Sequence, residues 1–116
     1  MKLSGEGRLL RIFIGEADKL HGFSLYEKIV ELARKEGLAG ATVLRGIESF
    51  GASSRIHTAK ILRLSEDLPI VIEIIDTREK IELLLPAVDS LLEQADCGGM
   101  VTIEPVEILK YFHTKK

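Results

Sequence analysis

GATVLRGIESFGASSRIHT, residues 40–58, is the stretch around which the rest of the chain is organised. Its first part is apolar and rich in β-branched residues, which predicts a strand from Ala41 to about Phe50. Gly46 interrupts this strand and indicates a bulge or a close approach by another backbone or a ligand. Residues 51–59 form a loop of small residues with two cations, Arg55 and His57. A strand that leads into such a loop and returns is typical of a loop that holds or signals a ligand.

Two further strands and a helix are predicted on either side of this stretch. Residues 7–14 (GRLLRIFI) alternate between two faces, and residues 70–75 (IVIEII) give the strongest strand signal in the chain. A helix is expected from residue 24 to about residue 36. Ser24 and Glu27 have the spacing of a capping box, and Gly37 is expected to end the helix as a left-handed cap.

The second half of the chain repeats the pattern. A helix with a wide apolar face begins at about residue 76, and Pro86 inside it is expected to kink or split it. After the break at residues 96–99, residues 100–104 form a strand. Pro105 is expected to interrupt that strand, and residues 106–112 follow as a further extended piece.

This element order predicts an α+β fold, the ferredoxin-like βαββαβ sandwich. It has a four-stranded antiparallel sheet with two helices on one face and, here, an extra C-terminal strand. We expect a single domain over residues 1–116, with a flexible loop at about 51–59. The sheet face away from the helices remains largely aliphatic, which favours an oligomer that covers it.

Composition excludes several classes of function. The net charge of −2 argues against a broad nucleic-acid face. One cysteine, Cys97, excludes an internal disulfide and fits a reducing compartment. The chain has no apolar run of membrane-spanning length and no signal-peptide pattern, so a cytoplasmic protein is expected. It has no Walker motif, dinucleotide fingerprint or nucleophile–base set, and its histidines and cysteine lack metal-site spacing, so neither an enzyme nor a bound metal is expected.

Residues 40–86 closely resemble the family of uncharacterised PII-like signalling proteins and, more distantly, the nitrogen-regulatory PII proteins. The resemblance covers nearly the whole chain. It is most specific in GATVLRG, FGASSRIHT, SEDLPIVIEIIDT and the Gly-Gly before the last strand. It implies a homotrimer with an adenine nucleotide (ATP, ADP or AMP) in clefts between subunits. It also implies that the loop reads the nucleotide and contacts a partner, often a membrane transporter; members of this type are often encoded beside fluoride channels.

The resemblance places the ligand site at four positions in the sequence. Ser49, Phe50 and Gly51 match the base of the family's mobile loop, and residues 73–75 match the strand that flanks the nucleotide base. Residues 98–100 match the Gly-rich turn that approaches the phosphates, and Lys110 and Tyr111 lie near tail arginines of the PII proteins. With two arginines whose forks suit phosphates, the expected ligand-binding set is Arg45, Ser49, Phe50, Gly51, Arg55, Glu73, Ile74, Gly98, Gly99, Met100 and Lys110.

The sequence departs from the PII pattern near the phosphates. Cys97-Gly-Gly-Met100 replaces the turn that carries a phosphate-binding lysine, and Ala52 and Ser53 replace the arginine and glutamine after Phe-Gly. The short loop has no tyrosine to modify. These differences favour a diphosphate or monophosphate ligand, or none, over a triphosphate with magnesium.

Other interpretations of the same residues stay open. Gly98 and Gly99 also fit an ordinary helix cap and turn, the arginines fit surface ion pairs, and Glu73 fits a cross-strand pair. The alternative functions are a ferredoxin-like trimeric metal-tolerance or small-ligand binding protein without nucleotide, and a small enzyme. RNA binding through the sheet is disfavoured because Phe13 is the only aromatic residue in the first strand.

Overall fold

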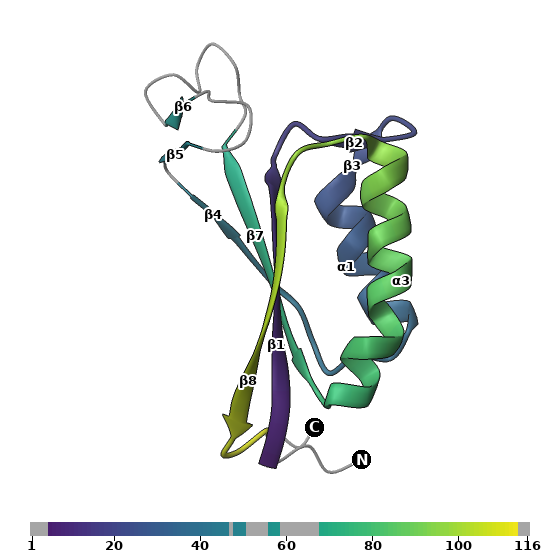
Figure 1. Ribbon diagram of the computed structural model, residues 1–116, viewed down its shortest axis with the longest axis vertical. Helices are drawn as coiled ribbons and strands as arrows, with labels where there is room; N and C mark the ends of the chain where they lie inside the picture. The colour runs from purple at the N-terminus through teal and green to yellow at the C-terminus, as the bar shows by residue number, and fades with distance from the viewer. Residues whose placement is uncertain (1–4, 47, 51–55, 59–67, 114–116) are drawn as a thin grey trace.

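A layer of strands and a layer of two helices make up the protein in the computed structural model (Figure 1), which describes residues 5–46, 48–50, 56–58 and 68–113. The elements run in the order β1 (Gly5–Gly15), β2 (Lys19–Leu20), β3 (Phe23–Ser24), α1 (Leu25–Lys35), β4 (Thr42–Arg45), β5 (Glu48–Phe50), β6 (Ile56–Thr58), β7 (Pro69–Asp76), α3 (Arg78–Ala95) and β8 (Met100–Ile108).

The main sheet has the strand order β4-β7-β1-β8, and each neighbouring pair is antiparallel. Both helices cover the same face of this sheet (Figure 1). The central strands β1 and β7 are those with the strongest alternation in the sequence. The predicted ferredoxin-like sandwich is therefore confirmed.

The core lies between the sheet and the helices, because one face of each central strand is apolar throughout. The side chains that meet there are Leu10, Ile12 and Ile14 of β1, Ile70, Ile72 and Ile74 of β7, Leu25, Ile29 and Ala33 of α1, and Ile81, Leu84 and Val88 of α3. All are branched aliphatic residues or alanine, which pack closely in fixed rotamers. The core thus fixes the register of the sheet, since a shift by one residue would turn this apolar set outward.

The opposite side of the sheet, which we call the open face, carries the alternate residues. Strand register brings Leu44, Val71, Phe13 and Met100 into one row across it, and Thr42, Glu73, Arg11 and Thr102 into the next. Met100 is 61% exposed, Leu44 48% and Ile75 42%. The open face is therefore an apolar surface with a charged centre.

The predicted strand from Ala41 to Phe50 is in fact two strands. β4 ends at Arg45, and the Gly46 amide donates to the Pro69 carbonyl at 2.8 Å. A Cβ at Gly46 would lie 2.8 Å from Cγ of Pro69, so the expected close approach is by another part of the same chain. β5 pairs with β6 in a separate hairpin, so residues 56–58, predicted as loop, form a strand.

Pro86 does not split its helix, and Pro105 does not interrupt its strand. α3 runs unbroken from Arg78 to Ala95 with Pro86 inside it. β8 runs unbroken through Pro105, which pairs with Arg8. Residues 106–108 of the predicted extra C-terminal strand extend β8, and residues 109–113 have no regular secondary structure.

The ends of α1 agree with the sequence at its C-terminus but not at its N-terminus. Gly37 has the left-handed φ of 79° expected after α1, and Asp96 takes the same conformation after α3 with φ 51°. Thr77 caps α3 by accepting from the Lys80 amide at 3.2 Å. Ser24 is the N-cap residue of α1, but its side chain makes no capping hydrogen bond, so the predicted capping box is wrong.

Candidate functional site: a groove on the open face

The open face contains a groove of about 600 Å³ at the end of the sheet where β4 begins and β8 ends. Three segments that are far apart in sequence line it. They are residues 39–42 before and at the start of β4, Glu73 and Ile75 of β7, and residues 106–111 from β8 and the tail. Its lining combines aliphatic side chains with backbone polar groups, two carboxylates, one threonine, one lysine and one tyrosine. Such a mixture suits a small ligand that has a flat apolar part and a few hydrogen-bonding groups.

One wall of the groove is anchored from the core by a buried carboxylate. Asp76, at the end of β7, has no exposed surface. Its Oδ2 accepts from the Ala39 amide and its Oδ1 from the Thr77 amide, each at 2.7 Å. These two bonds satisfy a buried carboxylate that would otherwise be costly. Asp76 therefore fixes the chain before β4 to the start of α3.

The other wall is the tail after β8. The Tyr111 hydroxyl donates to the Ala39 carbonyl at 2.9 Å, which links the two walls. Nζ of Lys110 lies 4.6 Å from the centre of the Phe112 ring, a cation–π contact. Lys110 is thus the one predicted ligand-binding cation that the described residues place at the groove.

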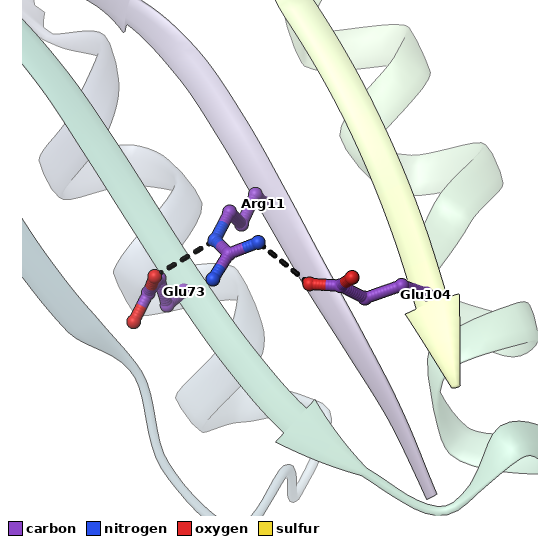
Figure 2. A network of polar contacts seen from close by, with 3 residues as sticks. All are labelled: Arg11, Glu73 and Glu104. Atoms are coloured by element: carbon purple, nitrogen blue, oxygen red, sulfur yellow. Dashed lines mark hydrogen bonds and ion pairs between the residues drawn. The ribbon is translucent and has the colours of Figure 1, made fainter. Parts of the chain in front are cut away.

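An ion-pair network lies at the centre of the open face, beside the groove (Figure 2). Nε of Arg11 bonds Oε2 of Glu73 at 2.9 Å, and its Nη1 bonds Oε1 of Glu104 at 2.6 Å. The hydrogen bond to Glu73 is the largest of the effects that raise the pKa of Arg11 above its ordinary value, while desolvation opposes them. Glu73 therefore forms a cross-strand ion pair, which is one of the two interpretations that the sequence left open for this residue.

The remaining predicted residues lie elsewhere. Arg45 forms an ion pair with Glu16. Ile74 has no exposed surface and faces the helices, so its side chain does not reach the groove. Ser49 and Phe50 belong to β5, in the hairpin beyond the opposite end of the sheet (Figure 1). Gly51 and Arg55 lie outside the described residues.

The Gly98–Met100 turn lies at the start of β8, so β8 separates it from the groove (Figure 1). A Cβ on Gly99 would lie 2.2 Å from the carbonyl oxygen of Phe13. Glycine is therefore required here by the close packing of two backbones, whatever the turn binds. We call Arg45, residues 49–50 and residues 98–100 the upper group; it lies at the end of the sheet opposite the groove.

Metal-binding and reactive side chains are sparse among the described residues, and no group of three His, Cys, Asp or Glu is placed to hold an ion. Cys97 is half-buried in the turn before β8. Burial, and then the charges of Asp18 and Asp96, raise the pKa of its thiol. That shift disfavours the thiolate, which is the reactive form.

Sequence reasoning missed most of the groove. Thr42 falls in the predicted strand and Gly40 just before it, Ala39 has no predicted role, and Tyr111 is expected only near a tail position. No short motif marks them, because the groove forms where distant segments meet. One signal was present: residues 40–42 directly precede a strand and contain small side chains that leave the backbone accessible.

Comparison with known proteins shows the family to which the chain belongs. The family model DUF190, described as Uncharacterized ACR, COG1993, matches residues 7–108. The chain belongs to the DUF190 family. It is 37% identical over 102 residues to a UPF0166 protein of Aquifex aeolicus, covering 88% of this chain and 92% of that protein. It is 33% identical over 105 residues to a UPF0166 protein of Methanocaldococcus jannaschii, covering 90% and 94%.

This DUF190 chain also has the fold of PII-like proteins. CPII, a nitrogen regulatory PII-like protein from Thiomonas intermedia K12 whose structure contains ADP, AMP and bicarbonate, superposes with a TM-score of 0.70. That match covers 90% of each chain at 18% sequence identity. At this level of identity the comparison shows a shared fold and nothing more. Among the residues described for the DUF190 chain, no helix is both long and apolar enough to cross a membrane.

Proposed function

We propose that this DUF190 protein is a PII-like regulatory protein that binds an adenine nucleotide. The observation that carries the proposal is the groove on the open face, which brings Glu73 and Lys110 together with an exposed backbone segment and a tyrosine. An adenine ring presents apolar faces to aliphatic side chains and hydrogen-bonding edges to backbone groups. The relation in fold to CPII, in whose structure ADP and AMP are bound, supports the same ligand class.

We place the proposed site between copies of the chain, because the groove and the upper group lie far apart within one copy. β8 has nine residues and, at about 3.3 Å per residue, spans roughly 26 Å between the upper group and the groove. A nucleotide in the groove of one copy reaches glycine amides only if a neighbour supplies its residues 98–100. The exposed Leu44, Ile75 and Met100 on the open face give a neighbour apolar surface to cover. A homotrimer is the assembly we propose.

In this proposal the protein has no catalytic role and acts in the cytoplasm. The nucleotide changes the position of the loop at residues 49–58, and that loop contacts a partner, for which a membrane transporter or channel is the proposed class. The whole chain acts as one PII-like domain. No metal is required, because Lys110 and backbone amides supply the positive charge for a monophosphate or diphosphate.

Calorimetry with ATP, ADP and AMP tests nucleotide binding, and light scattering tests assembly. We expect micromolar affinity for at least one nucleotide and a mass three times the 12.9 kDa of one chain. The proposal fails if none of the three binds more tightly than about 1 mM, a free energy of about −4 kcal/mol.

Lys110→Ala tests the assigned cation. It should weaken ADP binding about tenfold while leaving adenosine, which has no phosphate, unchanged. Lys35→Ala, in the exposed last turn of α1, is the matched control and should change neither. An equal loss for ADP and adenosine would contradict a phosphate contact by Lys110.

A further inference from the structure

The Ala39 carbonyl at the edge of the groove is a rigidly held acceptor. The three residues that lead to it are each fixed by a hydrogen bond. The Gly37 carbonyl accepts from Nζ of Lys80 at 2.7 Å, the Leu38 amide donates to the Ala33 carbonyl at 3.0 Å, and the Ala39 amide donates to buried Asp76. The carbonyl of Ala39 is thus held in place by its own chain before any ligand binds, which is the property of a preorganised binding group.

The donor that this carbonyl accepts from is held much less firmly. The Tyr111 hydroxyl makes the bond at 2.9 Å from a tail segment without regular structure. Tyr111 is 51% exposed, and its neighbours Leu109 and Phe112 are 83% and 73% exposed. Tyr111 also lies beyond residues 7–108, which match the family model. The acceptor is therefore fixed and its donor can be replaced.

We propose that Tyr111 is an internal competitor for the groove, whose hydroxyl occupies the acceptor that reads the exocyclic amino group of an adenine base. This inference rests on the proposed function. Glu73, one of the two carboxylates that line the groove, is already paired with Arg11. The amino group of adenine donates as the tyrosine hydroxyl does, whereas the 6-oxo group of hypoxanthine would place one acceptor against another. The Ala39 carbonyl therefore selects an amino-bearing base, and Tyr111 lowers its affinity.

Displacement of Tyr111 by a bound ligand changes the conformation of the tail. A base that takes the Ala39 carbonyl releases the tyrosine, and with it the exposed Leu109 and Phe112. Binding then requires the open form of the tail, so the apparent affinity is reduced by the fraction of chains that have it. The tail thus becomes a second segment, besides residues 49–58, whose position reports the ligand.

Removal of the hydroxyl tests this competition. Tyr111→Phe keeps the ring and frees the acceptor, so AMP should bind about fivefold more tightly, the effect of one hydrogen bond. IMP, whose base lacks the amino group, should gain less than twofold. Tyr26→Phe is the matched control, because Tyr26 packs against the core on α1 and lies outside the groove. It should leave both affinities unchanged.

A second measurement follows Tyr111 directly. The chain has two tyrosines, so the Tyr26→Phe protein grown with fluorotyrosine has one fluorine resonance, from Tyr111. AMP should shift this resonance towards that of an exposed tyrosine. If wild type binds no nucleotide, the proposed function fails. If it binds AMP while Tyr111→Phe leaves the affinity unchanged or weaker, or improves AMP and IMP equally, or if the resonance does not move, the competition proposed here is wrong.

Discussion

Asp76 gives the sharpest test of how the groove is built. Its carboxylate is fully buried and accepts from two amides at 2.7 Å. Asp76→Ala leaves both amides buried without an acceptor. At about 1.5–3 kcal/mol for each bond to a charged group, the loss in free energy of unfolding is about 3–6 kcal/mol. For a domain of this size that corresponds to a fall in melting temperature of roughly 12–24 °C.

Asp76→Asn separates hydrogen bonding from shape. The amide keeps one oxygen as an acceptor but turns its NH₂ group towards a backbone donor. The loss should therefore be about half that of alanine, roughly 1.5–3 kcal/mol. Urea unfolding followed by circular dichroism at fixed protein concentration measures both variants. Asp89→Asn, on the exposed side of α3, is the control and should stay within about 0.5 kcal/mol.

The reasoning about Asp76 is refuted if its asparagine variant unfolds at the urea concentration of wild type. It is also refuted if Asp76→Asn and Asp89→Asn lose the same amount. A folded Asp76→Asn protein offers one more observation. Its Ala39 wall is held less firmly, so any ligand in the groove should bind more weakly, while the upper group is unaffected.

Two other sites give independent tests. Gly99→Ala should destabilise the fold by about 1–3 kcal/mol in urea unfolding, with or without nucleotide, because its Cβ would overlap the Phe13 carbonyl. Gly40→Ala, where a Cβ meets nothing within 4 Å, should be neutral, and equal losses would argue against the overlap. Cys97 should react slowly with a disulfide reagent at pH 8 and faster after unfolding, because burial and Asp18 raise its pKa in the native state. A native rate equal to the unfolded rate would show that this shift is absent.

The sheet and helices could be predicted from the sequence because their residues alternate or recur at fixed spacing. The central strands at residues 7–14 and 70–75 bury one face each, so the alternation in their sequence matches the alternation of buried and exposed side chains in the sheet. The interruption predicted at Pro105 is wrong, because the place of a proline in the sheet decides its effect. Pro105 lies in β8, at the edge of the sheet, where a missing amide breaks no ladder if it faces outward.

The groove could not be predicted in the same way. Ala39 and Tyr111 are 72 positions apart and meet because the segment before β4 and the tail after β8 line the same groove. Neither residue belongs to a motif that has a chemical meaning by itself. The pairing of Glu73 with Arg11 was open in the sequence, since an isolated carboxylate in a strand fits a ligand and a cross-strand partner equally.

Pro105 also affects how copies of this protein avoid aggregating with one another. A nine-residue edge strand presents a row of backbone groups on which strands of other chains can add, the route to fibrous aggregation. Proline removes one donor from that row, and Glu104 and Glu107 place like charges on both sides of it. The edge is thereby a poor template for uncontrolled strand addition, even though it continues unbroken along β1.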